Sequence, residues 1–244
     1  MTNGDEAIVF ERVSFAYGDK PVLRDVGLRV PRGVLCALIG PNGAGKSTSL
    51  NLITTLLRPQ QGRVRVCGHD VAAAPDAVRS ALGYAPEESL LFSGLTAREF
   101  VELAGALHGL GPADAARATN ELLDQFGLAA RADDMLASFS KGMRRKTVLA
   151  AALVHDPELL VLDEPMEGLD VVAQQTLKEL LRRRVTRGRS VLYSTHMIEV
   201  VESLCTHVAL LRQGQLLAQG AIAAVCAELG VASLEALFRQ PAPE

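Results

Sequence analysis

The chain has 244 residues, of which 48% are hydrophobic, and its 28 acidic and 25 basic residues give a formal net charge of −3. This composition supports a folded protein with one large or two small cores and excludes a disordered or fibrous chain. A dedicated nucleic-acid binder needs a basic field, so we expect no nucleic-acid partner.

The cysteines and the apolar runs bear on where the protein works. The four cysteines, at positions 36, 67, 205 and 226, form no Cys-x-x-Cys pair, so we expect reduced, buried thiols in a cytosolic protein. The N-terminus is acidic where a signal peptide is basic, and the longest apolar runs are far shorter than the roughly 20 residues that span a bilayer. If the protein works at a membrane, another chain must supply the spanning segments.

Segments with a β-strand pattern open the chain. They cover residues 8–15, 22–30 and 34–39 and are separated by turn residues. We expect them to build the sheet that delivers the loop after residue 39, within an N-terminal antiparallel β subdomain.

A glycine-rich loop, GPNGAGKST, follows at residues 40–48. Its glycines let the backbone fold around an anion with N–H groups pointing inward, and a helix predicted to begin near Lys46 presents its positive dipole end. Lys46 can reach the β- and γ-phosphates, and the Ser47 hydroxyl can bind Mg²⁺. The loop therefore predicts a nucleoside triphosphate site. Its predicted contacts are Gly40, Pro41, Asn42, Gly43, Ala44, Gly45, Lys46, Ser47 and Thr48.

The rest of the chain changes character twice. A short hairpin is expected at residues 62–68 and a buried strand at 81–85, and residues 96–137 then read as helices, with Thr96 three residues before Glu99 as a capping signal. Strands are expected at 159–162, 190–194 and 208–211, with helices at 171–186 and after His196, and two short helices in the tail from 221 to 238. This alternation indicates an α/β fold with a mostly parallel sheet covered by helices.

These elements predict one nucleotide-binding domain. The β and nucleotide core is expected in residues 1–95 and 156–220, a helical insertion in 96–155 and a short helical tail in 221–244.

Two carboxylates end the predicted strand LLVLDE at residues 159–164. Paired carboxylates beside phosphates require a metal ion. In a phosphate-loop enzyme the first, Asp163, holds Mg²⁺ directly or through water, and the second, Glu164, is placed to polarise an attacking water. The alternative, a strand that ends in ordinary solvated acids, loses weight because the phosphate loop occurs in the same chain.

From about residue 8 to about 220 the sequence resembles the ATP-binding subunit of an ABC transporter. Residues 139–143, FSKGM, match the signature usually written LSGGQ, and the resemblance implies that Ser140 and Gly142 contact the γ-phosphate held by a second copy of the domain. It also implies that Tyr17 stacks on adenine, and that His196 holds the γ-phosphate and the attacking water. Gly168-Leu169-Asp170 matches the loop through which the two domains touch.

Several positions depart from the common pattern of this family. Glu87 stands where the family usually has a glutamine that contacts Mg²⁺; it still offers an oxygen but adds a negative charge beside ATP. Lys141 replaces a glycine of the signature and Met143 its glutamine. The strings GYAPEE and SKGM resemble bacterial exporters in which the membrane and ATP-binding parts are separate chains.

The function that the resemblance implies is ATP hydrolysis coupled to transport, with ATP and Mg²⁺ as cofactors and Glu164 and His196 as catalytic residues. Two domains, in a homodimer or a pair of subunits, would close head to tail on two Mg-ATP at the cytoplasmic face of the membrane. Integral membrane permease subunits would dock near residues 87–95, where Leu90, Leu91 and Phe92 form an apolar patch. A soluble ABC-type ATPase acting on nucleic acid and a metabolic kinase are the alternatives, and the transported substrate is not encoded here.

Overall fold

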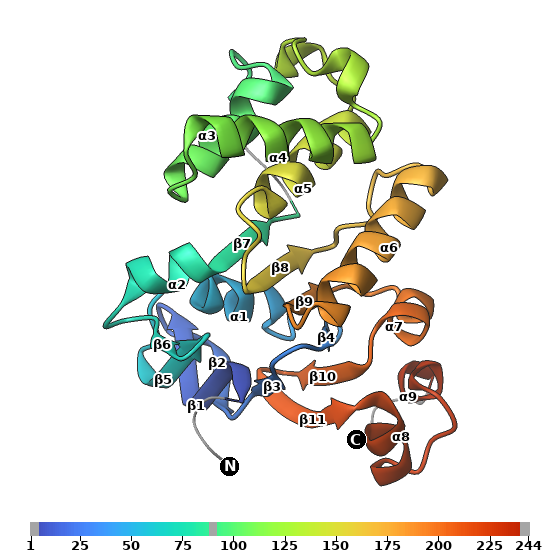
Figure 1. Ribbon diagram of the computed structural model, residues 1–244. Coiled ribbons are helices and arrows are strands. Elements are labelled where there is room, and N and C mark those ends of the chain that lie inside the picture. Colours follow the sequence, from blue (N-terminus) through green and yellow to red (C-terminus); the bar gives the residue numbers. More distant parts are fainter. Residues whose placement is uncertain (1–4, 88–91, 240–244) are drawn as a thin grey trace.

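Two β-sheets and the helices that pack around them make up the described part of the protein (Figure 1). The computed structural model describes residues 5–87 and 92–239. The central sheet has six strands in the order β11-β10-β4-β9-β8-β7, and the second sheet has five.

The central sheet is mostly parallel, as the alternating pattern predicted. Its strands are β4 Leu35–Ile39, β7 Leu82–Ala85, β8 Leu159–Asp163, β9 Ser190–Ser194, β10 His207–Arg212 and β11 Gln215–Ala221. Only β11, an edge strand that the sequence did not predict, runs antiparallel to its neighbour β10. Along β8, Leu160 and Leu162 join one hydrophobic cluster whereas Leu159 and Val161 join another. Both faces of this strand are covered, which explains why its sequence is continuously apolar.

The N-terminal segments form a separate antiparallel sheet. Its strands are β1 Glu6–Tyr17, β2 Lys20–Val26, β3 Arg29–Pro31, β5 Gln61–Val66 and β6 His69–Asp70. The expectation that all three opening segments deliver the phosphate loop is wrong, because only β4 belongs to the central sheet. The segment at 22–30 is also divided: β2 and β3 each pair with β1, and residues 27–28 separate them. Within β2, Asp25 has a φ of 51°, between the paired residues Leu23 and Val26.

Helices cover the central sheet on both sides. They are α1 Lys46–Ile53, α2 Pro75–Ala81, α3 Ala97–Leu107, α4 Pro112–Gln125, α5 Lys141–Leu153, α6 Val171–Thr186, α7 Ile198–Leu204, α8 Ile222–Glu228 and α9 Leu234–Arg239, with short 3₁₀ turns η1 Ala129–Arg131 and η2 Leu136–Ser138. Helices α3, α4 and α5 form a layer above β7 and β8 in Figure 1. The predicted helix at 171–186 is confirmed at both ends, whereas α2 was not predicted.

Side-chain caps fix the start of three helices. Thr96 accepts a hydrogen bond from the Glu99 N–H while the Glu99 carboxylate accepts one from the Thr96 N–H, so the predicted capping box begins α3. Ser140 caps α5, and Asp170 caps α6 through the Ala173 N–H.

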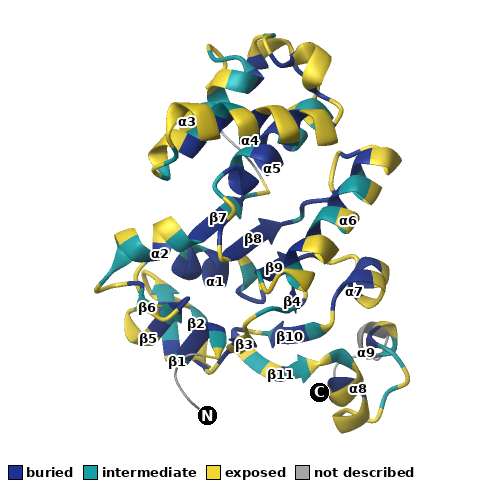
Figure 2. Ribbon diagram, viewed as in Figure 1, coloured by how far each residue is buried: buried dark blue, intermediate teal, exposed yellow. Residues whose placement is uncertain are grey.

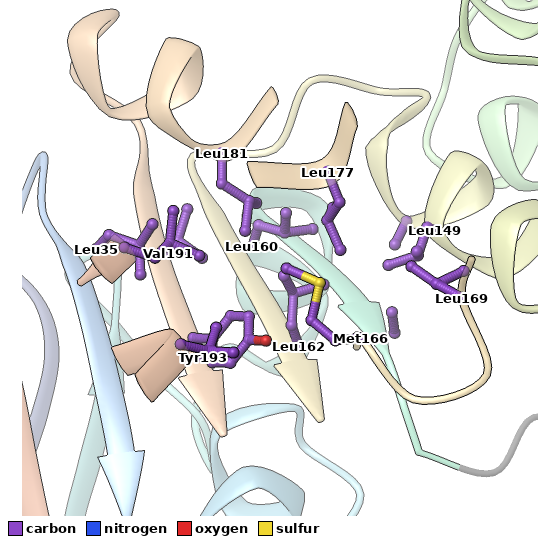
Figure 3. Close-up of a cluster of buried hydrophobic side chains, with 14 of the residues drawn as sticks. Leu35, Leu149, Leu160, Leu162, Met166, Leu169, Leu177, Leu181, Val191 and Tyr193 are labelled. Carbon is purple, nitrogen blue, oxygen red and sulfur yellow. The ribbon is translucent and has the colours of Figure 1, made fainter. Parts of the chain in front are cut away.

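The main core lies between the central sheet and α6 (Figure 3). Leu177 and Leu181 of α6 are fully buried with Leu160, Val191 and Tyr193 from the strands. Figure 2 shows the central strands β4, β8 and β9 buried, so the loops at their ends are attached to a packed scaffold.

All four cysteines are buried and unpaired, as predicted, and burial raises the pKa of the Cys36 thiol to about 12. Within residues 5–87 and 92–239, no helix has the length and apolar character needed to cross a membrane.

Candidate functional site

The phosphate loop connects β4 to α1, and its geometry depends on its glycines. Gly40, Gly43 and Gly45 all have positive φ, of 157°, 78° and 105°. A Cβ on Gly40 would lie 2.2 Å from the Leu211 carbonyl oxygen, and one on Gly45 would lie 2.6 Å from a methyl of Leu23. The loop therefore keeps its shape only with glycine at these two positions.

The loop presents a polar rim on a buried base. Pro41, Asn42, Gly43 and Ser47 are exposed, and the buried residues are Gly40, Ala44, Gly45 and Thr48. The loop is also tied to the sheet edge, because the Gly214 N–H donates to the Ala44 carbonyl at 3.1 Å. Exposed backbone N–H groups at a helix N-terminus suit an anion.

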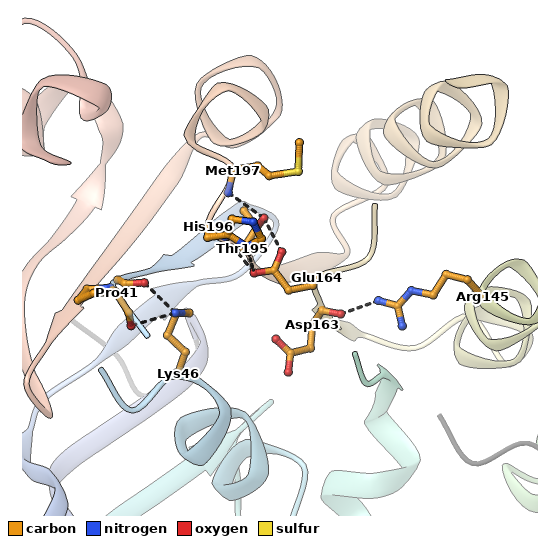
Figure 4. Close-up of polar contacts among 9 residues, drawn as sticks. Pro41, Lys46, Arg145, Asp163, Glu164, Thr195, His196 and Met197 are labelled. Carbon is orange, nitrogen blue, oxygen red and sulfur yellow. Dashed lines mark hydrogen bonds and ion pairs between the residues drawn. The ribbon is translucent and has the colours of Figure 1, made fainter. Parts of the chain in front are cut away.

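Lys46 lies at the mouth of the loop (Figure 4). Its ammonium donates to the carbonyl oxygens of Gly40, at 2.7 Å, and Pro41, at 3.2 Å. Partial burial lowers the pKa of Lys46, and the charges of Glu164, Asp163 and Glu87 oppose that shift. These three carboxylates are therefore within electrostatic reach of the loop lysine.

The two predicted carboxylates lie where β8 ends. Asp163, the last residue of β8, pairs with Ser194, the last residue of the parallel neighbour β9, so the two strands end at the same edge of the sheet. The Asp163 side chain is buried, and burial raises the pKa of its carboxyl, while Arg145 and Lys46 act in the opposite direction. Glu164 has a φ of 44°, an unfavourable backbone conformation for a residue with a side chain, and its N–H donates to the Ser194 carbonyl at 3.0 Å. Such strain is often found at functional sites.

Glu164 is held by the two residues that follow β9. The Thr195 hydroxyl donates to Oε2 at 2.8 Å, and the His196 N–H donates to Oε1 at 3.0 Å. The His196 ring nitrogen Nδ1 is also 2.7 Å from Oε1. The structure thus brings together His196 and Glu164, the two residues predicted to be catalytic. It adds Thr195, whose role the sequence signalled only by its position before His196.

The signature residues lie at the start of α5. Ser140 accepts the Met143 N–H with its hydroxyl, and a Cβ on Gly142 would lie 2.7 Å from the Gly168 carbonyl oxygen. Lys141 also forms an ion pair with Glu167, with its Nζ 2.6 Å from Oε1. In the described chain, neither Ser140 nor Gly142 hydrogen-bonds to the phosphate loop. The signature therefore packs on residues 167–170 of its own chain, called the linking loop below.

Two further predicted residues lie at the edges of the site. Tyr17, near the end of β1, is 51% exposed, and its ring packs edge to face on Phe15 with centroids 5.0 Å apart. Glu87 is exposed just after β7. In the apolar patch predicted for docking, Phe92 is 65% exposed, whereas Leu90 and Leu91 lie outside the described residues.

Comparison with known proteins shows the family of this chain. Residues 23–167 match the family described as "ABC transporter". The chain is 37% identical over 236 residues to the daunorubicin resistance ATP-binding protein DrrA3 of Streptomyces coeruleorubidus, covering 97% of this chain and 75% of that protein. It is 34% identical over 220 residues to the linearmycin resistance ATP-binding protein LnrL of Bacillus subtilis strain 168, covering 90% and 71%. A solved structure described as an ATP binding subunit of an ABC transporter is 35% identical, with a TM-score of 0.91 and coverage of 95% and 98%.

Proposed function

This chain belongs to the ABC transporter ATP-binding family, and we propose that it closes with a second copy of the domain on two Mg-ATP and drives export through separate membrane-spanning subunits. Proteins of this family bind ATP and hydrolyse it to power transport, and this chain is an ATP-binding subunit of that kind. One feature of the site supports the function most: the phosphate loop and the Asp163-Glu164 pair converge at the same edge of the central sheet.

The residues around the loop fit a divalent cation with oxygen ligands. The Ser47 hydroxyl is exposed at the start of α1, and Asp163 and Glu87 are both close enough to Lys46 to affect its pKa. Hydroxyl and carboxylate oxygens are the ligands that Mg²⁺ uses in triphosphate sites. When bound, Mg²⁺ would neutralise charge on the phosphate oxygens. Ser47, Asp163 and Glu87 would hold it.

Other side chains would hold the nucleotide itself. Lys46 is in place to donate to phosphate oxygens, together with the backbone N–H groups of residues 42–48. The exposed ring of Tyr17 offers a flat apolar face to the adenine.

Glu164 would accept a proton from the water that attacks the γ-phosphate. Three hydrogen-bond contacts fix its carboxylate in one orientation, through Thr195 and through the N–H and Nδ1 of His196. A fixed base costs less reorganisation when the proton moves. The exposed edge of the His196 ring would contact the γ-phosphate.

The second protomer would complete the site through its signature. Ser140 and Gly142 begin α5, whose N-terminal dipole attracts an anion, yet within one chain they face the linking loop. A phosphate bound to one protomer would therefore meet this helix end only from the partner.

The relatives suggest the direction of transport and the partners. DrrA3 and LnrL are named as drug resistance proteins, a role that fits export. Permease subunits would supply the spanning segments and place this chain at the cytoplasmic face of the membrane. Exposed Phe92 lies on the expected docking surface.

Nucleotide-driven dimerisation tests the proposal. We expect Glu164→Gln to bind ATP, to hydrolyse it about 10²–10⁴ times more slowly, and to elute as a dimer with Mg-ATP and as a monomer without it. Adding Ser140→Ala to this variant should weaken the dimer without weakening ATP binding to the monomer. A Glu164→Gln protein that stays monomeric with saturating Mg-ATP, or that hydrolyses ATP at the normal rate, would contradict the mechanism.

A further inference from the structure

Arg145 is a buried arginine in the second turn of α5, the helix that the signature begins. It is 7% exposed. Its Nη2 donates to the Asp163 carbonyl oxygen at 2.5 Å, and its Nη1 donates to the Pro86 carbonyl and, at 3.4 Å, to the Glu87 carbonyl. A single guanidinium therefore joins α5 to the ends of β7 and β8. Figure 4 shows the contact with Asp163.

The two strand ends that Arg145 joins carry the carboxylates proposed to hold the cation. Glu87 follows β7 and Asp163 ends β8. Arg145 donates to the backbone carbonyls of both residues, so it fixes the backbone from which the two carboxylates project.

The position is electrostatically unfavourable for a cation unless it is compensated. Arg145 lies near the positive end of the α5 dipole, next to Arg144 and Lys146, and burial lowers its pKa. The charges of Asp163, Glu167 and Glu87 act in the opposite direction. Replacement of the carbonyl contacts by water would require α5 to move away from the sheet, so α5 and the two strand ends are expected to move together.

We propose that Arg145 is a positioning residue that links the signature helix to the backbone of Glu87 and Asp163 in the same protomer, so that displacement of α5 shifts the site for the cation. The inference rests on the proposed function for its consequence in catalysis. The linkage itself is a property of the chain and can be measured without nucleotide.

A matched control exists at the opposite end of the sheet. Arg184 is also 7% exposed, donates to the Pro157 carbonyl and pairs with Asp156 at 2.9 Å, just before β8 begins. In both arginines Nε has no hydrogen-bond partner within the described part of the chain. Arg184→Gln therefore removes a comparable buried guanidinium far from the carboxylates.

The first experiment measures hydrogen–deuterium exchange without nucleotide in the wild type, Arg145→Gln and Arg184→Gln. We expect exchange in peptides covering residues 82–87 and 159–164 to rise roughly tenfold in Arg145→Gln, because hydrogen bonds to a charged donor are lost. In Arg184→Gln, peptides around residue 157 should respond and those at 82–87 should not. Equal exchange at 82–87 in Arg145→Gln and the wild type would overturn the proposal.

The second experiment measures steady-state ATPase activity of the same proteins against ATP and Mg²⁺. We expect Arg145→Gln to lower kcat about 10- to 100-fold and to raise the Mg²⁺ concentration for half-maximal activity severalfold, with little change in ATP affinity. Arg184→Gln should match the wild type at temperatures where both are folded. Arg145→Lys, which keeps the charge but lacks the planar fork, should recover only part of the activity and serves if Arg145→Gln does not fold.

The outcomes separate this inference from the proposed function. Normal ATP hydrolysis by Glu164→Gln would contradict the proposed function. In that case hydrogen–deuterium exchange in Arg145→Gln would still test whether Arg145 links α5 to the two strand ends. Normal kcat and Mg²⁺ dependence in folded Arg145→Gln, with Glu164→Gln inactive, would overturn the role of Arg145 alone.

Discussion

His196 contacts the same carboxylate oxygen of Glu164 twice, with Nδ1 2.7 Å and the backbone N–H 3.0 Å from Oε1. Since a carboxylate only accepts, Nδ1 donates in this contact and the ring is held in one orientation. Thr195 occupies the other oxygen, Oε2. The proposed base is therefore oriented by the end of the neighbouring strand.

Thr195→Val should lower kcat without changing ATP affinity. Valine has the same shape as threonine but lacks the hydroxyl, so Oε2 loses its 2.8 Å hydrogen bond and Glu164 can rotate. A hydrogen bond to a charged group is worth about 1.5–3 kcal/mol, so we expect kcat to fall roughly 10- to 100-fold. Thr195→Ser keeps the hydroxyl and should retain most activity. Equal rates for the two variants would remove Thr195 from the site.

Lys46→Ala should fail at nucleotide binding. Its ammonium lies 2.7 Å from the Gly40 carbonyl at the mouth of the loop, so the substitution removes the positive charge of the loop. We expect at least a roughly tenfold loss of affinity for a fluorescent ATP analogue in equilibrium titration. Lys178→Ala, on α6, is the control. Unchanged affinity in Lys46→Ala would show that the loop binds phosphate through its backbone alone.

Gly142→Ala should disturb the packing of the signature on the linking loop. A Cβ at this position would lie 2.7 Å from the Gly168 carbonyl oxygen, so either the start of α5 or the linking loop must move. We expect ATP to bind the monomer normally while ATP-driven dimerisation, measured by light scattering in the Glu164→Gln background, weakens severalfold. Gly27→Ala, where a Cβ would meet nothing within 4 Å, is the control. Full dimerisation of the Gly142→Ala protein would argue that this contact does not shape the interface.

The stability of the protein should depend on His155 at acid pH. Its Nε2 is 3.1 Å from the Leu82 carbonyl, its ring stacks on His108 with centroids 3.5 Å apart, and Nδ1 is buried without a partner in the described chain. Burial lowers the pKa of His155 to about 4, with the charge of His108 as a smaller cause. Above the unfolded pKa near 6.5 the ring is neutral in the folded and the unfolded protein. As pH falls through 6.5 toward 4, the ring takes up a proton more readily in the unfolded protein, so the free energy of unfolding decreases.

His155→Phe removes this titration while keeping a ring for the stack. The free energy of unfolding of each protein, measured with urea, should decrease between pH 7 and pH 4.5. We expect the decrease in His155→Phe to be roughly 1–3 kcal/mol smaller than in the wild type. The same substitution at the exposed His69 should leave the pH dependence unchanged. Parallel pH profiles for wild type and His155→Phe would show that the ring is solvated.

Much of the site could be predicted because its parts are short and contiguous. Two parts of the site depend only on neighbouring residues: the glycines before Lys46, which allow positive φ, and the apolar strand before Asp163 and Glu164. Both are found at the predicted positions. Caps such as Thr96 and Asp170 also act within one turn. Edge strand β11 and helix α2 were missed, because pairing and packing partners far along the chain hold these short elements.

The sequence by itself determined the phosphate loop, the strand that ends in two carboxylates and the membership of the family, since each depends on neighbouring residues. Only the tertiary structure decided that Arg145, and not its neighbour Arg144, is buried against the ends of β7 and β8. It also decided that Thr195 and His196 hold Glu164 across 31 and 32 positions of sequence. The physical reason is that parallel strands bring their carboxyl ends together whatever their separation along the chain.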